Sequence, residues 1–148
     1  MTKRVQYELF TDGACLGNPG PGGWAFILRN GDEEVVLSGG DPDTTNQRME
    51  VVAVLRALES LKEPSAILIH ADSKYVTDGL TKWMDGWLKK GWKNAAKKPV
   101  KNQDLWKPLS KLRTVHEITT HWVKGHSGHT ENERCDTLAS AEAEKFLL

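Results

Sequence analysis

The sequence lacks several features that would place it in a specialised class of protein. Its 148 residues contain only two cysteines, Cys15 and Cys135, with no C-x-x-C pair and no Cys/His spacing typical of zinc. This excludes a disulfide framework and a zinc finger, and it favours a reducing cytoplasm. No apolar run approaches the roughly 18 residues of a membrane span, and the opening segment has no signal-peptide core. We therefore expect one cytoplasmic domain over residues 1–148.

The sequence also has no net charge, because 20 lysines and arginines balance 20 aspartates and glutamates. The balance hides a basic lobe, residues 82–113, which holds ten cations against two anions and so carries a local charge of +8. A basic segment on an acidic body is typical of nucleic-acid binders, since phosphates meet local charge. Four tryptophans are spaced among these lysines and are expected mainly to form a local core. They are Trp83, Trp87, Trp92 and Trp106.

Hydrophobic periodicity predicts an α/β fold. Predicted strands cover residues 5–12, 24–29, 34–38, 65–71 and 117–123, and predicted helices cover residues 45–62, 75–80, 103–112 and 131–146. The glycine-rich segment GACLGNPGPGG after Asp12 is expected to be a loop or a wide hairpin, and Asn30-Gly31-Asp32 is expected to be a hairpin turn. Thr44 and Gln47 have capping-box spacing at the first helix. The order predicts a five-stranded mixed sheet flanked by helices.

Three carboxylates stand in positions that need an explanation. Asp12 and Asp72 lie at the ends of predicted strands, where α/β folds commonly build sites, although Asp12 could serve a turn and Asp72 could cap a helix. Glu50 has apolar neighbours and faces the core side of its helix, so it needs a cation, a shared proton or a metal ion. An ion pair with Arg48 or Arg56 is the structural alternative.

The last predicted helix brings a fourth carboxylate, Asp136, whose own face also carries small residues such as Ala139. Four carboxylates aimed at one region repel one another unless cations neutralise them, and an all-oxygen site selects Mg²⁺ or Mn²⁺ over zinc. His126, in the KGHSGH turn before this helix, is a candidate acid or base, with His129 or a plain surface histidine as alternatives. The other histidines, His70, His116 and His121, are expected to be ordinary strand residues.

Five segments resemble, in the same order, bacterial ribonuclease HI of the type 1 RNase H family. They are FTDGACLGNPGPGGW, TTNQRMEVVAVLRAL, ADSKYV, WMDGWLKKGWKNAAKKPVKNQDLW and HWVKGHSGHTENERCDTLA, and they cover nearly the whole chain. The resemblance implies an RNase H-like fold with a basic protrusion at about residues 82–101 in a single catalytic domain. It also implies hydrolysis of the RNA strand of RNA–DNA hybrids by two Mg²⁺ ions, leaving 5′-phosphate and 3′-hydroxyl ends, in a monomer that needs no protein partner.

The same resemblance implies roles for individual residues. Metal binding would belong to Asp12, Glu50, Asp72 and Asp136, and these residues would carry the catalysis together with His126. Contacts with the minor groove and phosphates of the hybrid would come from Cys15, Asn18, Thr45, Asn46 and Gln47. The protrusion would bind substrate through Lys89, Lys90, Lys93, Lys97, Lys98, Trp83 and Trp87. The chain departs from the family at Gln47, where asparagine is usual, and at Lys74, where glutamine is common.

Two other functions fit parts of the sequence. A nuclease of the transposase or resolvase kind could use the same fold, because a fold alone does not fix function. A nonenzymatic nucleic-acid binder could use the basic lobe only. The HSGH segment and the lobe favour the hybrid nuclease over the first alternative, and the full set of carboxylates disfavours the second.

Overall fold

The structure is a computed structural model in which residues 5–124 and 130–147 are described. Its strands are β1 (Val5–Cys15), β2 (Gly20–Asn30), β3 (Glu33–Thr44), β4 (Ser65–Ala71) and β5 (Glu117–Trp122). Its helices are α1 (Asn46–Glu59), α2 (Lys74–Asp78), the π-helix η1 (Gly79–Trp83), α3 (Met84–Lys89), α4 (Gln103–Val115), α5 (Thr130–Glu144) and the 3-10 helix η2 (Lys145–Leu147). Among the described helices, none is long and apolar enough to cross a membrane.

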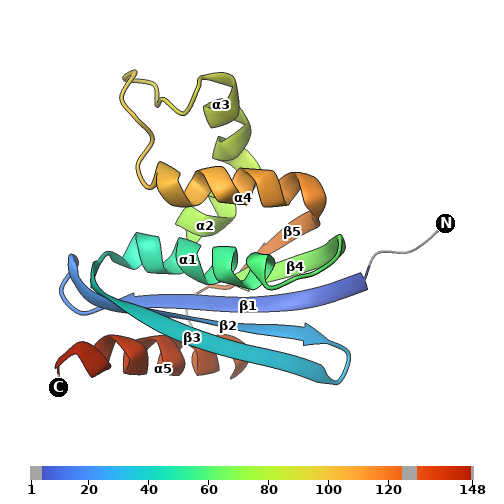
Figure 1. The fold of residues 1–148 in the computed structure, drawn as a ribbon, viewed down its shortest axis with the longest axis vertical. Coiled ribbons are helices and arrows are strands. Elements are labelled where there is room, and N and C mark those ends of the chain that lie inside the picture. Colours follow the sequence, from blue (N-terminus) through green and yellow to red (C-terminus); the bar gives the residue numbers. More distant parts are fainter. Residues whose placement is uncertain (1–4, 125–129, 148) are drawn as a thin grey trace.

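The strands form one mixed sheet in the order β3-β2-β1-β4-β5, which confirms the five-stranded sheet expected from the sequence. The first three strands are antiparallel neighbours, whereas β4 pairs in parallel with both β1 and β5. The carboxyl ends of β1, β4 and β5 therefore lie at the same edge of the sheet. Helix α1 lies on one face of the sheet and α5 on the other (Figure 1).

Successive residues of β1 enter two different cores, because side chains alternate between the faces of a sheet. Leu9 is fully buried under α1 and α4 in the larger core, which also contains Val54 and Trp106. Phe10 is buried under α5 in a smaller core with Cys135. Both faces of the central strands are thus covered, and this fixes where α1 and α5 place their polar side chains.

The glycine-rich segment forms a hairpin in which most of its residues belong to strands, so of the two expected alternatives the wide hairpin is confirmed and the plain loop is not. Strand β1 continues past Asp12 to Cys15, and β2 already begins at Gly20. A Cβ atom on Gly13 would lie 2.5 Å from the backbone nitrogen of Glu50, and one on Gly23 would lie 2.0 Å from the carbonyl oxygen of Ala139. These glycines therefore let α1 and α5 approach the sheet closely.

Other boundaries agree in part, since β2 and β3 extend well beyond the predicted residues 24–29 and 34–38. The predicted strand at 65–71 is confirmed, and β5 ends one residue before the predicted position. The cap of α1 is Thr45 and not Thr44, because Thr45 Oγ1 accepts the N–H of Arg48 at 3.2 Å. The predicted helix at 75–80 is longer, since α2, η1 and α3 run without a break from Lys74 to Lys89.

The basic lobe projects from the rest of the molecule through α3 and the segment that leads into α4 (Figure 1). Trp106 is fully buried, and its ring centroid lies 5.4 Å from that of Trp87, which in turn lies 6.2 Å from Trp92. Trp106 Nε1 also donates a hydrogen bond of 3.0 Å to the hydroxyl of Tyr75. The expected local core of tryptophans is therefore present, although Trp83 is 38% exposed at its edge.

Candidate active site

Three carboxylates from separate elements converge near the carboxyl ends of β1 and β4. Asp12 comes from β1, Glu50 from α1 and Asp72 from the end of β4, and one oxygen of each lies within 4.8 Å of one oxygen of the others. Asp12 and Glu50 are buried, whereas Asp72 is partly exposed. One side of the group is therefore open to solvent while the other is enclosed by the fold.

The structural alternatives for these carboxylates do not hold in the structure. Arg48 forms two hydrogen bonds with Asp104, at 3.0 and 2.8 Å, and Arg56 pairs with Glu59 at 2.7 Å. Both arginines that could have neutralised Glu50 are thus engaged elsewhere.

The capping and turn alternatives fail in the same way. Ser73 and not Asp72 caps α2, because Ser73 Oγ accepts the N–H of Val76 at 3.3 Å. Asp12 lies inside β1 and not in a turn, and its Oδ1 accepts the N–H of Gly13 at 2.9 Å.

The electrostatics of the group are unfavourable without a cation or bound protons. Asp12 Oδ2 and Glu50 Oε2 are buried and find no hydrogen-bond partner in the described part of the chain. Burial, and then the charge of Asp72, raise the pKa of Asp12 to about 7. Burial and the charge of Asp12 raise the pKa of Glu50 well above its usual value. Like charges brought together in a desolvated place raise the free energy of the ionised state.

These carboxylates fit a divalent metal ion. Ionised carboxylates only accept hydrogen bonds and offer several lone pairs, so two buried oxygens without donors are open to a cation. An all-oxygen donor set suits hard divalent ions such as Mg²⁺ and Mn²⁺. A bound cation would also offset the burial and the repulsion that raise both pKa values.

Asp136 and the candidate histidines differ from the three converging carboxylates in what the structure shows of them. Asp136 is half-buried on α5 and does not belong to the group of three carboxylates, yet its charge contributes to the raised pKa of Asp12. It therefore acts on the same region of the protein. His126 and His129 lie outside the described residues.

Asn132 is a residue of this region that sequence reasoning missed. It is fully buried on α5, one helical turn before Asp136, and its Nδ2 donates to the carbonyl oxygens of Thr11 at 3.3 Å and His70 at 3.0 Å. Thr11 directly precedes Asp12 on β1, and His70 lies just before Asp72 on β4. One side chain thus ties α5 to both strands that carry converging carboxylates. An asparagine four residues from Asp136, on the same helix face, was the available signal.

Trp122 is a second missed residue at this edge. Its indole N–H donates to the backbone carbonyl of Asp72 at 3.0 Å, and the ammonium of Lys74 lies 4.4 Å from the centroid of the ring system. This distance is typical of a cation–π interaction. Lys74, one of the departures from the family pattern, is therefore held against an exposed aromatic ring beside the carboxylates.

The residues expected to meet the minor groove of a hybrid form a continuous rim. Cys15 Sγ lies 3.4 Å from the carbonyl oxygen of Thr44, and Asn18 Oδ1 accepts the N–H of Asn46 at 2.9 Å. Thr45 caps α1, and Asn46 and Gln47 are exposed in its first turn. The rim is therefore built on the same helix that carries Glu50, one turn away.

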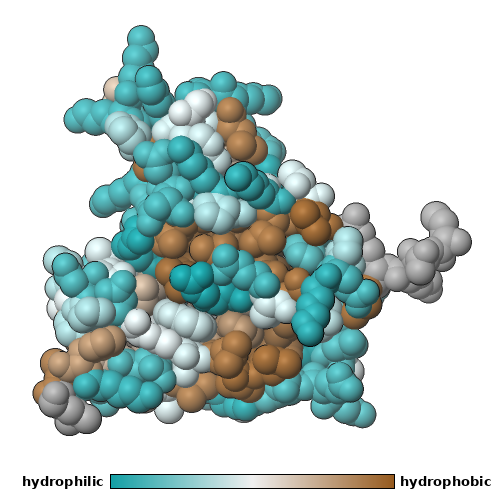
Figure 2. Space-filling view, in the orientation of Figure 1, coloured by the Kyte–Doolittle hydropathy of each residue, from teal (hydrophilic) through white to brown (hydrophobic). Residues whose placement is uncertain are grey.

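The lysines expected to bind phosphates lie in the basic lobe, away from the carboxylates. Figure 2 shows hydrophilic residues covering most of this projection. The five lysines are all exposed, namely Lys89, Lys90, Lys93, Lys97 and Lys98. Trp83 is exposed and Trp87 is half-buried, so the former presents more of its ring at the surface.

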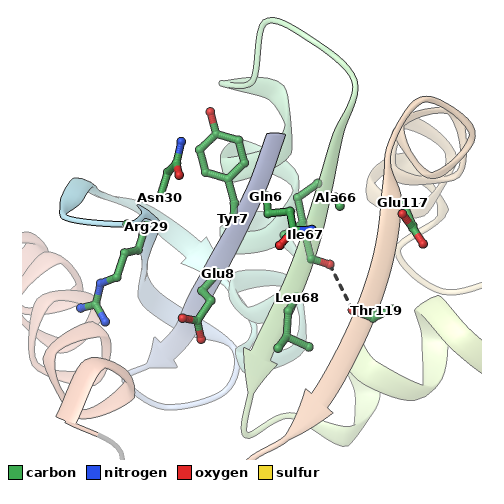
Figure 3. A pocket seen from close by; sticks show the side chains of 11 residues that line it. Gln6, Tyr7, Glu8, Arg29, Asn30, Ala66, Ile67, Leu68, Glu117 and Thr119 are labelled. Carbon is green, nitrogen blue, oxygen red and sulfur yellow. Dashed lines mark hydrogen bonds between the residues drawn. The ribbon is translucent and has the colours of Figure 1, made fainter. Parts of the chain in front are cut away.

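A pocket of about 520 Å³ opens elsewhere on the sheet (Figure 3). Its lining includes Gln6, Ala66 and Glu117, which lie at the amino ends of β1, β4 and β5. The carboxylates lie toward the opposite ends of these parallel strands, which is where open α/β sheets usually bind ligands. The pocket is therefore separate from the candidate active site.

Comparison with known proteins gives one consistent result. The family described as RNase H matches residues 4–144. The chain is 60% identical over 137 residues to a protein named Ribonuclease H from Rhodospirillum rubrum, covering 93% of this chain and 82% of that protein. It is 55% identical over 145 residues to a protein of the same name from Halorhodospira halophila, covering 98% and 97% of the two chains.

Solved structures agree with the sequence relatives. The crystal structure of LC9-RNase H1, a type 1 RNase H with the type 2 active-site motif, aligns with a TM-score of 0.85 at 28% identity, over 98% of this chain and 74% of that chain. LC11-RNase H1 in complex with an RNA/DNA hybrid aligns with a TM-score of 0.73 over 96% and 99% of the two chains. Its 20% identity supports the fold alone.

Proposed function

The chain belongs to the RNase H family, and on that premise we propose that it is an endoribonuclease that hydrolyses the RNA strand of RNA–DNA hybrids. The observation that carries the proposal is the convergence of Asp12, Glu50 and Asp72 in one buried, acidic group. The matching region spans nearly the whole chain, so we assign the activity to a single catalytic domain that includes the basic lobe.

We propose Mg²⁺ as the cofactor, with two ions in the substrate complex and Mn²⁺ as a substitute. Asp12, Glu50 and Asp72 would hold the ions, with Asp136 as a fourth ligand. When bound at a phosphodiester, such ions lower the pKa of a water and stabilise charge on the attacking and leaving oxygens. Cleavage in this way leaves a 5′-phosphate and a 3′-hydroxyl.

The chain itself orients its acidic oxygens for this purpose. The N–H of Gly13 holds Asp12 Oδ1, which leaves Oδ2 without a protein donor. Asn132 fixes the strands beside Asp12 and Asp72, and the indole of Trp122 holds the carbonyl of Asp72. His126 is proposed to assist proton transfer at the reacting water or the leaving group.

Recognition of the hybrid is proposed to use two surfaces. The rim of Cys15, Asn18 and residues 45–47, which is partly to fully exposed, would read 2′-hydroxyls in the minor groove, because these groups distinguish RNA from DNA. The lysines of the basic lobe would contact phosphates, which supply most of the sequence-independent affinity. LC11-RNase H1, which shares the fold, has been solved in complex with an RNA/DNA hybrid.

An assay with three labelled substrates tests the proposal. The protein is incubated with an RNA–DNA hybrid, duplex DNA or duplex RNA in Mg²⁺, and each reaction is repeated in EDTA. We expect cleavage of the RNA strand of the hybrid only, and none in EDTA or with the E50Q variant. Cleavage of duplex DNA would favour the transposase or resolvase alternative, and binding without cleavage would favour the nonenzymatic binder.

A further inference from the structure

Three polar side chains on neighbouring strands form a connected group that the proposed mechanism does not use. His70 Nε2 lies 2.9 Å from Oε2 of Glu8, and His70 Nδ1 lies 3.0 Å from Nδ1 of His121. Glu8 is on β1, His70 on β4 and His121 on β5, which are adjacent in the sheet, and the two histidines are direct partners in the parallel register.

The group lies on one face of the sheet. Figure 3 shows Glu8, Leu68 and Thr119 side by side on three strands. His70 and His121 follow Leu68 and Thr119 by two residues, so they share that face, because strand side chains repeat every second residue. His70 is 7% exposed, whereas His121 is exposed. Solvent therefore reaches the pair from the side of His121.

The ring of His70 is held in place by stacking, and its hydrogen-bond partner determines which ring nitrogen carries the hydrogen. The ring stacks on Phe10 at a centroid distance of 4.8 Å, with planes 12° apart. An ionised carboxylate only accepts hydrogen bonds, so Nε2 of His70 must donate to Glu8. The neutral imidazole then presents the lone pair of Nδ1 to His121. Metal-binding histidines show this arrangement, since the outer nitrogen donates to a carboxylate and the inner nitrogen binds the ion.

The distance between the two inner nitrogens fits a shared metal ion. Two nitrogens bound to one Zn²⁺ are about 2.9 Å apart when the bonds are at right angles and about 3.4 Å apart in tetrahedral geometry. The observed 3.0 Å falls inside this range. Imidazole ligands favour borderline ions such as Zn²⁺ and Ni²⁺, whereas Mg²⁺ prefers oxygen. The pair thus differs in chemistry from the carboxylate group.

We propose that His70 and His121 bind one borderline transition-metal ion, with Zn²⁺ as the probe, and that Glu8 orients His70 for this purpose. The ion replaces the hydrogen bond between the two Nδ1 atoms and lies to one side of the line that joins them, and His121 carries its hydrogen on Nε2 instead, so two neutral rings release no proton. Water completes the coordination on the exposed side. The ion links β4 to β5 immediately before Asp72 and Trp122, so it also stabilises this edge of the sheet.

Calorimetric titration of Zn²⁺ into the metal-free chain, with excess Mg²⁺ present, tests the proposal. We expect one Zn²⁺ per chain, and the same stoichiometry in D12N, whose carboxylate group is impaired. H121Q should bind Zn²⁺ at least about tenfold more weakly than the wild type. E8Q should lose about tenfold in Zn²⁺ affinity, as is usual for a residue that hydrogen-bonds to a metal ligand. H121Q changes an exposed side chain, so its fold is not at risk.

Two controls make the result decisive. The variant H126Q/H129Q should bind Zn²⁺ as the wild type does, and bound Co²⁺ should show the visible absorption of nitrogen ligation in the wild type but not in H121Q. The proposal is overturned if the wild type binds no Zn²⁺, if H121Q binds it unchanged, or if D12N or H126Q/H129Q abolishes binding. Hybrid cleavage in Mg²⁺ is measured separately, so failure of the proposed nuclease function would be distinguishable.

Discussion

Asp12 is subject to two opposing demands, since burial favours its protonated form and cation binding requires its ionised form. Its pKa of about 7 shows how strongly burial and Asp72 oppose ionisation when no cation is present. We predict that D12N abolishes hybrid hydrolysis, because loss of a metal ligand costs several kcal/mol of transition-state stabilisation and each 1.4 kcal/mol is about tenfold. The kcat at saturating Mg²⁺ measures this loss.

The same substitution should raise the melting temperature measured in EDTA, because asparagine has nearly the same volume and does not repel Glu50 and Asp72. D32N is the matched control, since Asp32 is exposed in the turn between β2 and β3, which lies beyond the Glu8 end of β1 and away from Asp12. It should leave both kcat and the melting temperature unchanged. Retention of more than about a tenth of the wild-type rate by D12N would remove Asp12 from the site.

Sequence reasoning found the carboxylates but not the residues that position them. The apolar neighbours of Glu50 predicted that its side chain faces the core. The ends of two predicted strands singled out Asp12 and Asp72. Asn132 acts on the backbone of Thr11, 121 residues away, and on that of His70, 62 residues away. Contacts with distant carbonyl groups leave no local pattern, so only the folded chain reveals them.

At the scale of elements, Asn132 adds a polar link from α5 to β1 and β4 beside the apolar packing of that helix on the sheet. We predict that N132A lowers the free energy of unfolding by about 1 to 3 kcal/mol, because two buried hydrogen bonds to backbone carbonyls are lost. Urea unfolding measures this change. We also expect the Mg²⁺ concentration needed for half-maximal kcat to rise, since Asp12 and Asp72 are less well fixed.

T137A on the same helix is the control for N132A. The hydroxyl of Thr137 is exposed and bonds only locally, to the carbonyl of Glu133 at 3.1 Å. Its loss should change stability by less than about 0.5 kcal/mol. If N132A and T137A have equal stability and equal Mg²⁺ dependence, the attachment by Asn132 is not required.

The basic lobe is the element that we expect to hold the substrate without taking part in chemistry. We predict that alanine at Lys89, Lys90, Lys93, Lys97 and Lys98 raises the KM for the hybrid and flattens its salt dependence. Each lost phosphate contact lowers the slope of log K against log salt by about 0.7 to 0.9. The kcat should stay within a few-fold, because uniform binding is removed and the carboxylates are untouched.

The lobe must remain folded for that result to be interpreted. All five lysines are exposed, whereas the lobe is held together by the contacts of Trp87, Trp92 and Trp106. The near-ultraviolet circular dichroism of the tryptophans should therefore be unchanged in the five-lysine variant. An unchanged KM together with an unchanged salt slope would mean that the lobe does not bind the substrate.

Strands and helices with a clear hydrophobic pattern were predicted well, whereas elements whose form depends on close packing with other elements were not. The apolar run of β4 gave its exact bounds, because a buried parallel strand is continuous in hydrophobicity. The glycines of β1 and β2 suggested a loop or a wide hairpin; the hairpin is present, but the glycines also allow the approach of α1 and α5, which the sequence did not predict. Helix α3 was missed because its burial comes from the tryptophan core of the lobe and not from a helical period of its own.

At the scale of the whole molecule, charge is divided between a basic lobe and an acidic body. The lobe carries +8 and the rest of the chain −8. An acidic body repels the phosphates of a nucleic acid, so close approach to Asp12, Glu50 and Asp72 requires compensation. Cations held by the carboxylates and lysines of the lobe would supply it together, and this explains why a neutral chain is suited to a polyanionic substrate.

The same acidic group makes global stability depend on pH when no metal is present. The pKa of Asp12 is about 7 in the folded protein, against 3.8 for an ordinary aspartate, so between these values the folded state binds more protons than the unfolded state. We therefore predict that, in EDTA, the free energy of unfolding falls as the pH rises from about 4 to 7, by at most about 1.4 kcal/mol per pH unit for each proton. Glu50, whose pKa is also raised, acts in the same direction.

Urea unfolding at several pH values, in EDTA and in Mg²⁺, measures this dependence. Asp104, whose pKa Arg48 lowers, contributes stability that is lost only as the pH falls below about 4, outside the window. The difference between wild type and D12N reports Asp12 together with its coupling to the neighbouring carboxylates, because groups that do not interact with Asp12 cancel. We expect this difference to grow with pH in EDTA and to vanish or reverse in Mg²⁺, since a bound cation stabilises the ionised carboxylate. A difference that does not vary with pH would show that Asp12 is not protonated in the metal-free fold, and the repulsion inferred for the whole group would then be wrong.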